Sequence, residues 1–341
     1  MIRPPFYLRE EITPQIVELL TSVTLGTNGA KYRHLNTEER IHQLYKPLFL
    51  TLERRNKVLG TVTFCRRPVG WYIRYFAFNP HLQSKGAKKS SNQGLLKRQL
   101  TNFFEQHLGE KTNDKSAELM YAYIDPRNER SLWMSEQFNF KTVATIATQT
   151  FSRVEPKHEP NVKKLSGSYL EEAKQKISEH FTKHQLFFEK HTYNDSPMYG
   201  YFEADELVAL VKVYHANWII ERLPGPSGGF LTTAIPYLPW LRKIIQPKKH
   251  NFLVFESLWY KPSHSTKIEK LMEGALYCEN RNSAIWWVDE KDAVYNDNKD
   301  VINWGLLHKL NGVSKVSLVV KSNKKLEASS APYFVTGFDF I

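Results

Sequence analysis

Cysteine is scarce in this sequence, and long apolar stretches are absent. The 341 residues include only two cysteines, Cys65 and Cys278, which cannot form a disulfide framework and fit a reducing compartment. No apolar run approaches the ~18 residues that a membrane-spanning helix needs. The first ten residues are interrupted by Arg3, Arg9 and Glu10, unlike a signal peptide. We therefore expect a soluble cytoplasmic protein without a membrane partner.

Common motifs for nucleotides and metals are also missing. There is neither a Gly-x-x-x-x-Gly-Lys-Ser/Thr phosphate loop nor a dinucleotide Gly-x-Gly-x-x-Gly pattern. His180 and His184 lie four residues apart on an expected helix, a spacing that can present two imidazoles to zinc, but no cysteine or glutamate motif accompanies them. We expect these histidines on a solvated helix face and no bound metal.

Positive charge is in excess. The chain has 47 Lys and Arg against 35 Asp and Glu, a net charge of +12. Such an excess favours polyanionic partners, namely nucleic acid, anionic lipid or a phosphorylated cofactor. The cations are scattered in doublets such as Arg66-Arg67 and Lys248-Lys249, without a basic tail. A solvated basic surface is the alternative, and nucleic-acid binding is not favoured.

The length and composition predict two globular domains. Hydrophobic residues make up 41% and charged residues 24%, which excludes a disordered chain. Residues 155–168 contain two prolines, a glycine, serines and mixed charge, which is typical of a linker. We therefore expect domains at 1–154 and 169–341.

Apolar spacing in the first half predicts alternating helices and strands. The expected elements are a helix at 14–25 with Thr13 as its N-cap, strands at 48–52, 58–64 and 70–78, a helix after Ser91 with Leu96, Leu100, Phe103, Phe104 and His107 on one face, a strand at 118–124, a helix at 128–138 and a strand at 141–151. This order fits a mixed α/β fold with a partly parallel sheet.

The second half repeats this order loosely, although two unrelated α/β domains of similar rhythm remain an alternative. The expected elements are strands within 198–213 and at 251–260, a helix at 266–277, a strand at 284–288, a helix at 299–310, and strands at 313–320 and 333–340.

The loop after the strand at 70–78 has the features of an anion site. It leads into a helix, whose first N–H groups lack intrahelical acceptors and carry the positive end of the helix dipole. Gly86 allows close backbone approach, while Lys85, Lys88 and Lys89 add positive charge. A diphosphate is the natural ligand of such a loop.

Two segments resemble the GNAT superfamily of N-acyltransferases. Pro80, Gln83 and Gly86 match the spacing of its acyl-CoA-binding loop, and Asn128, Ser131 and Phe140 match the spacing of a helix motif downstream. The resemblance covers about residues 1–153 and implies an acetyl-CoA or other acyl-CoA ligand. The residues implied to contact it are Phe78, Gln83, Lys85, Gly86, Ala87, Lys88, Asn128 and Ser131.

The sequence departs from that pattern at the positions that carry chemistry. The strand glutamate that often acts as general base corresponds to Tyr72, a poor base at neutral pH, and the helix tyrosine that often protonates the thiolate corresponds to Ser135. Lys88 replaces a small residue, and the loop carries an insertion of about four residues. The remaining catalytic candidates are the backbone N–H around Phe78 and a proton relay through Tyr72 or His81, although His81 also fits a solvated loop residue.

The second half resembles a degenerate copy of the first. Its loop after Pro262 has neither the Gln/Arg nor the glycine, and Glu256 is expected either to face an acceptor cleft or to lie on the surface. The resemblance thus implies acyl transfer to an amine of a small molecule or peptide. The alternatives are a tandem aminoacyl transferase that uses aminoacyl-tRNA and a non-catalytic CoA-binding module.

Overall fold

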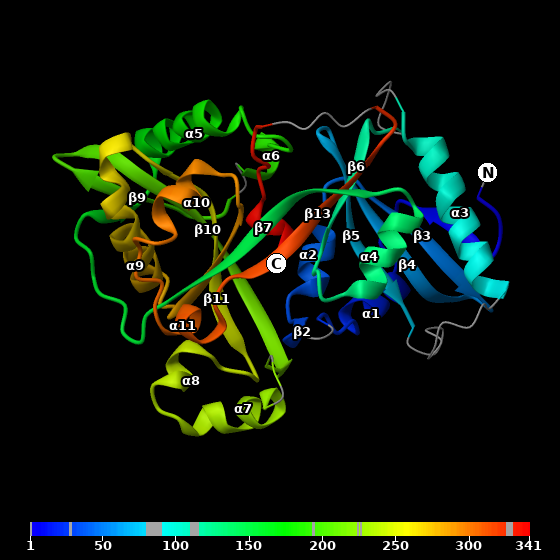
Figure 1. Cartoon of the computed structure of the whole chain (residues 1–341), viewed down its shortest axis with the longest axis horizontal. Coiled ribbons are helices and arrows are strands. Elements are labelled where there is room, and N and C mark those ends of the chain that lie inside the picture. Colours follow the sequence, from blue (N-terminus) through cyan, green and yellow to red (C-terminus); the bar gives the residue numbers. More distant parts are fainter. Residues whose placement is uncertain are drawn as a thin grey trace. The chain divides into compact units, whose positions relative to one another are not determined.

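The computed structural model of the chain describes residues 2–26, 29–79, 91–109, 116–192, 195–223, 225, 227–324 and 330–341. Its helices and strands alternate along the chain as expected (Figure 1). They divide into two compact units. Unit 1 comprises Met1–Leu25, Leu35–Val143 and Ser317–Ala328, and unit 2 comprises Gly26–His34, Ala144–Val316 and Ser329–Ile341.

Unit 1 is built on a mixed sheet with the strand order β1-β3-β4-β5-β6-β13. Its antiparallel strands 47–54 and 57–67 form the expected hairpin, and β5 and β6 are parallel neighbours. The elements are β1 (Phe6–Arg9), α1 (Pro14–Thr21), α2 (Thr37–His42), β3 (Pro47–Arg54), β4 (Lys57–Arg67), β5 (Gly70–Phe78), α3 (Ser91–His107), β6 (Leu119–Ile124), α4 (Glu129–Gln137) and the later part of β13 (Ser314–Ser322).

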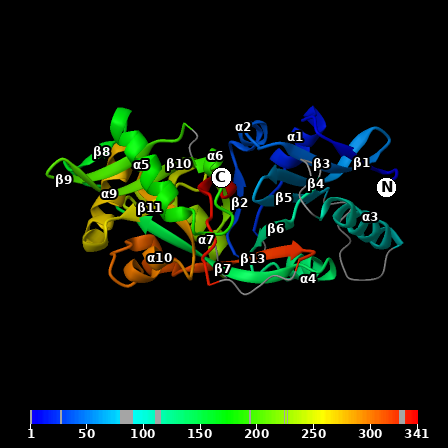
Figure 2. The ribbon, with the colours of Figure 1, turned by 90° about the horizontal axis from the view of Figure 1, so that it is seen from above.

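Helices cover both faces of this sheet (Figure 2). On one face, α3 buries Leu100, Phe103 and Phe104 against the strands. On the other face, Ile16 and Leu20 of α1 and Ile41 of α2 are buried against the sheet. Thr13 caps α1 as its sequence predicts, since its hydroxyl accepts the N–H of Ile16 at 3.4 Å.

Unit 2 repeats this architecture with the strand order β7-β12-β11-β10-β9-β8, and β2 pairs with β10. Here β11 and β12 are the parallel neighbours. The elements are β2 (Lys31–His34), β7 (Lys141–Ser152), β8 (Val162–Lys164), α5 (Gly167–Phe181), α6 (Glu189–Thr192), β9 (Met198–Glu203), β10 (Glu206–Arg222), α7 (Gly228–Ala234), the 3-10 helix η2 (Ile235–Tyr237), α8 (Leu241–Ile244), β11 (His250–Tyr260), the 3-10 helix η3 (Pro262–Lys267), α9 (Ile268–Cys278), β12 (Ser283–Asp289), α10 (Ala293–Asn298), α11 (Leu306–Asn311) and the 3-10 helix η4 (Gly337–Asp339).

The two units do not follow the expected boundary, because each sheet contains a strand from the other half of the sequence. From Ala144 onward, β7 belongs to unit 2, where it pairs antiparallel with β12. Residues 317–322 of β13 belong to unit 1, where they pair antiparallel with β6. Lys321 reinforces this assignment by donating to the carbonyl oxygen of Phe138 at 2.7 Å.

The expected linker at 155–168 is also wrong in part. Residues 162–164 form β8, which pairs with β9, and Val162 and Leu165 are buried. Two isolated apolar residues in a polar segment give no periodic signal, so only the tertiary packing reveals this strand.

Two more elements of the second half differ from expectation. Of the helix expected at 299–310, only the part from Leu306 is helical, as α11, because Gly305 with φ +87° precedes it as the N-cap; the preceding helix α10 ends at Asn298. The strand expected at 333–340 is a buried irregular segment that ends in η4, where Thr336 caps the turn by accepting the N–H of Phe338. The other elements expected in this half are confirmed within a few residues at their ends, except that β10 continues to Arg222, beyond the expected end at 213.

The scarce cysteines remain separate, with Cys65 buried and Cys278 exposed. None of the helices in the described ranges combines the length and the apolar character that crossing a bilayer demands.

Candidate functional site

The candidate site lies in unit 1, where β5 and β6 separate. Among described residues these strands pair only at Trp71↔Met120 and Tyr72↔Tyr121. Beyond that point β5 stays paired with β4 as far as Phe78, and β6 stays paired with β13 as far as Ile124. The two facing edges thus share no further sheet pairing, and their backbone groups point to where a ligand can accept or donate hydrogen bonds.

The end of β5 aims a backbone donor toward this opening. The N–H of Asn79 donates to the carbonyl oxygen of Leu59 in the segment of β4, at 2.8 Å. Because consecutive N–H groups of a strand point to opposite sides, the N–H of Phe78 points away from β4, toward β6. This is the direction that a donor to a ligand between β5 and β6 needs.

A bulge in β5 precedes this donor. The pairing with β4 passes from Phe64↔Ile73 to Thr63↔Tyr75, so Arg74 is the extra residue. A bulge bends the strand and re-aims the side chains that follow it, and bulges are common beside active sites. After it, Tyr75 and Ala77 are buried toward α1 and α2.

Tyr72 lies at the point where β5 and β6 part, in a buried cluster of tyrosines. It is 4% exposed, and its ring stacks on that of Tyr121 with centroids 5.3 Å apart. The ring of Tyr123 also lies beside that of Tyr72, with centroids 5.6 Å apart. The Arg67 guanidinium lies 5.0 Å from the centre of the Tyr72 ring and donates to the Tyr121 hydroxyl at 2.8 Å.

Arg67 is the residue of this cluster that the sequence does not single out. The doublet Arg66-Arg67 reads as surface charge, but Arg67 is 4% exposed. The position of Arg67 is the sequence feature that could have indicated its burial. Arg67 ends an alternating strand, and it precedes Tyr72 by five residues across a tight turn. A buried guanidinium stacked on aromatic rings is energetically acceptable because delocalised charge is weakly hydrated.

The phosphate loop expected after β5 falls in a part of the chain that the structure does not describe. His81, Gln83, Lys85, Gly86, Ala87 and Lys88 lie there, so their roles remain predictions. The flanking elements are confirmed: β5 ends at Phe78 and α3 begins at Ser91. A strand therefore precedes residues 80–90 and a helix follows them, in the order that an anion site at a helix N-terminus requires.

The helix motif downstream has a structural role. Asn128 is the N-cap of α4, and its side-chain oxygen accepts the N–H of Ser131 at 3.1 Å. The hydroxyl of Ser135 donates to the carbonyl oxygen of Leu132 at 2.7 Å. These contacts explain why the motif residues occur at this spacing, and they leave contact with CoA as a prediction.

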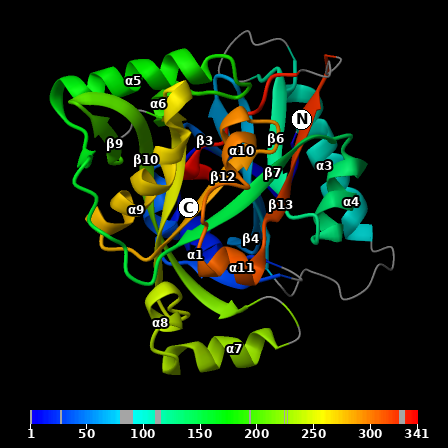
Figure 3. The same cartoon turned by 60° about the vertical axis from the view of Figure 1, so that its left-hand side comes forward.

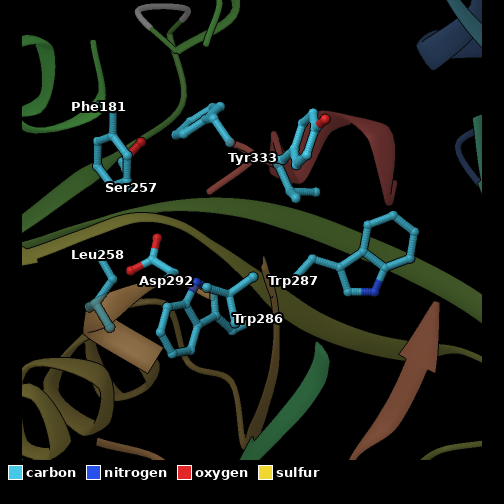
Figure 4. A pocket seen from close by; sticks show the side chains of 10 residues that line it. Phe181, Ser257, Leu258, Trp286, Trp287, Asp292 and Tyr333 are labelled. Carbon is cyan, nitrogen blue, oxygen red and sulfur yellow. The ribbon is translucent and has the colours of Figure 1, made fainter. Parts of the chain in front are cut away.

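The corresponding place in unit 2 is a small cavity lined by the unit's own side chains (Figure 4). Strands β11 and β12 pair from Leu253↔Ala284 to Phe255↔Trp286 and then part. Ser257, with φ +53°, marks a bulge just beyond this point. The buried C-terminal residues Phe334 and Val335 line the remaining cavity of about 20 Å³, which is room for roughly one water molecule.

The strand-to-helix connection of unit 2 also lacks a loop. Lys261 alone separates β11 from η3, which runs directly into α9. A loop that surrounds a diphosphate has no room here, in agreement with the missing glycine.

Both expectations for Glu256 are wrong, because it is neither exposed nor facing a cleft. Its Oε2 accepts hydrogen bonds from the Thr336 hydroxyl at 2.5 Å and the Gly337 N–H at 2.6 Å, and Oε1 lies 3.5 Å from Nζ of Lys212. Burial lowers the pKa of the Lys212 ammonium, and the Glu256 carboxylate opposes this effect. Glu256 therefore ties the C-terminal segment to the sheet.

The two histidines expected on a solvated helix face are partly or fully buried. His184 Nε2 lies 3.0 Å from Oδ2 of Asp292, and burial lowers the pKa of His180. No group of three His, Cys, Asp or Glu side chains suited to a metal occurs in the described part of the chain.

No family model and no curated protein matches the sequence, whereas solved structures do. The chain is similar to Saccharomyces cerevisiae N-myristoyltransferase with bound myristoyl-CoA, at 9% identity and a TM-score of 0.55, over 98% of this chain and 90% of that one. It is also similar to a GCN5-related N-acetyltransferase from Sphaerobacter thermophilus, at 11% identity and a TM-score of 0.51, over 97% and 100% of the two chains. The chain therefore shares the fold of these N-acyltransferases over nearly its whole length, in agreement with the fold that the resemblance implies.

Proposed function

We propose that this chain is an N-acyltransferase that moves an acyl group from acyl-CoA to an amine. The observation that carries the proposal is the early parting of β5 and β6 after Tyr72 and Tyr121, directly before a strand-loop-helix connection. The structurally similar proteins are acyltransferases, one of them with bound myristoyl-CoA, and this supports the same class of reaction.

In this proposal, the acyl-CoA diphosphate binds the loop between β5 and α3. The N-terminal N–H groups of α3 and Gly86 supply backbone donors, and Lys85 and Lys88 supply charge, with Gln83 and Ala87 beside them. The capped N-terminus of α4 at Asn128 and Ser131 forms a second border of the site. Unit 2 does not share this role in the proposal, because the cavity at its equivalent place, lined by Phe334 and Val335, has a volume of only about 20 Å³.

The proposed chemistry is direct attack of the amine nitrogen on the thioester carbon. A C–N bond forms, the C–S bond breaks, and negative charge develops first on the carbonyl oxygen and then on the leaving sulfur. The N–H of Phe78 stabilises the oxygen, which preorganised backbone donors do efficiently. The amine proton leaves through water, with Tyr72 or His81 as relay, and Ser135 is the residue proposed to lie nearest the departing thiolate.

A turnover assay tests this function. Purified protein is mixed with acetyl-, octanoyl- or myristoyl-CoA and a panel of amines and peptides, and the released CoA thiol is quantified together with the acylated product by mass spectrometry. The proposal expects amine-dependent thiol release with one product per thiol. Binding of CoA without turnover of any pair would instead identify a CoA-binding module, and turnover only with aminoacyl-tRNA would identify the aminoacyl transferase.

A further inference from the structure

A group of large apolar side chains is exposed in unit 2 between β10 and β11. The chain leaves β10 at Arg222 and enters β11 at His250, and α7, η2 and α8 lie together beyond the ends of these strands (Figures 1 and 3). We call residues 227–249 the lobe. Its exposed apolar residues are Phe230, Leu231, Tyr237, Leu238 and Trp240, with Tyr237 83% and Phe230 75% exposed.

The lobe is folded, so this exposure is not that of a loose loop. Ile235, Ile244 and Ile245 are buried and pack with Ile220 of β10 and Leu307 of α11. The hydroxyl of Thr232 also accepts the N–H of Leu223 at 3.0 Å. The isoleucines of the lobe are therefore buried, whereas its aromatic rings and leucines are exposed. Soluble proteins rarely expose such groups without a function.

The lobe is also positively charged. Arg242, Lys243, Lys248 and Lys249 are exposed, and the sequence has no aspartate or glutamate from 222 to 250. Lys243 does contact a carboxylate, Oε1 of Glu155 at 2.6 Å, but this acid lies outside the lobe. The surface thus combines apolar side chains with an excess of cations.

We propose that the lobe docks onto an anionic lipid surface. Tyrosine and tryptophan favour the boundary between headgroups and acyl chains, phenylalanine and leucine favour the acyl chains, and lysine and arginine favour anionic headgroups. A nucleic acid would attract the cations and stack on the rings, yet it offers nothing to Leu231 and Leu238. Docking departs from the sequence-based expectation of no membrane partner and is independent of acyl transfer.

Vesicle co-sedimentation of the full chain tests the proposal. The vesicles contain phosphatidylcholine alone or with about one third phosphatidylserine. We expect the chain to bind the anionic vesicles at least about tenfold more tightly than the neutral ones. Failure of the wild-type chain to bind anionic vesicles would overturn the proposal.

Two pairs of double variants identify the surface. Phe230→Ser/Trp240→Ser should lose binding, whereas Val301→Ser/Leu310→Ser, which removes exposed apolar groups elsewhere in unit 2, should keep it. Lys248→Glu/Lys249→Glu should lose binding, whereas Lys163→Glu/Lys164→Glu, with the same change of net charge, should keep it. Equal loss in the controls, or tRNA binding that depends on the lobe without vesicle binding, would contradict lipid docking.

Discussion

The rings of Tyr72 and Tyr121 stack at the last residue pair that joins β5 to β6. Each tyrosine also contacts the buried Arg67, one through its ring face and the other through its hydroxyl. The strands are thus held together on one side of this pair and are apart on the other.

Replacement of Arg67 should destabilise unit 1. Arg67→Leu removes the hydrogen bond to the Tyr121 hydroxyl and the contact with the Tyr72 ring, so we expect the free energy of unfolding to fall by about 2 kcal/mol. Denaturant titration followed by circular dichroism measures this. Arg54→Leu, at an exposed strand end, is the control and should change stability by less than about 0.5 kcal/mol. Equal effects would show that the cluster contributes nothing specific.

The role of Asn128 can be separated into capping and ligand binding. Asn128→Ala should cost about 1 kcal/mol of stability because the N–H of Ser131 loses its acceptor. Asn128→Asp should restore stability, since aspartate caps equally well and complements the helix dipole. Thermal unfolding measures the stability of the two variants, and an equal loss of stability in both would show that Asn128 does not act as the N-cap. If Asn128 also borders the diphosphate, the Asp variant alone should bind acyl-CoA more weakly.

Lys212 and Glu256 should behave as a coupled pair. Lys212→Met leaves a buried carboxylate without its cation, and we expect a loss of about 3–5 kcal/mol. The double variant Lys212→Met/Glu256→Gln should lose less than the sum of the single variants, because neither charge is left alone. A double-mutant cycle measures the coupling, and simple additivity would contradict it.

The buried His250 should make unit 2 sensitive to acid. Burial lowers its pKa to about 4, below its ordinary value of 6.5. A depressed pKa means that the unfolded chain binds the proton first, so the stabilisation is complete above pH 6.5 and is lost as the pH falls toward 4. From these values, unfolding free energy should drop by roughly 2 kcal/mol between pH 7.5 and 5 through this group.

His250→Phe provides the comparison for that pH dependence. The variant cannot take up the proton and keeps a flat ring beside Phe252, on which His250 stacks at 4.9 Å. Its unfolding free energy should therefore depend less on pH between 5 and 7.5 than that of the wild-type chain. Parallel pH profiles for both proteins would show that His250 does not bind the proton on unfolding.

Local sequence patterns predicted most elements but not the partners of the strands. The aromatic and apolar run at 70–78 and the cap at Thr13 depend on neighbouring residues, and the structure confirms both the strand and the cap. The exchange of β7 and residues 317–322 between the units depends on pairing across long sequence distances, for which a single sequence carries no signal.

The same distinction applies to the site. The resemblance singled out Tyr72 and Phe78, and the structure has Tyr72 in the last pair that joins β5 to β6 and Phe78 at the end of β5, while their roles stay predictions. Arg67 and Glu256 were misjudged because charge in a sequence suggests exposure. Only the structure shows that a tyrosine cluster accommodates the first residue, and that Lys212 and the C-terminal segment accommodate the second.

Calorimetric titration of acetyl-CoA into the purified chain tests the central claim most directly. The account predicts micromolar binding that Gly86→Glu abolishes, because a carboxylate would enter the diphosphate loop. Gly109→Glu is the control: it adds the same charge just past the other end of α3, a helix about 25 Å long, where a Cβ has open space. Binding that survives Gly86→Glu, or that both variants lose equally, would contradict an acyl-CoA site in this loop.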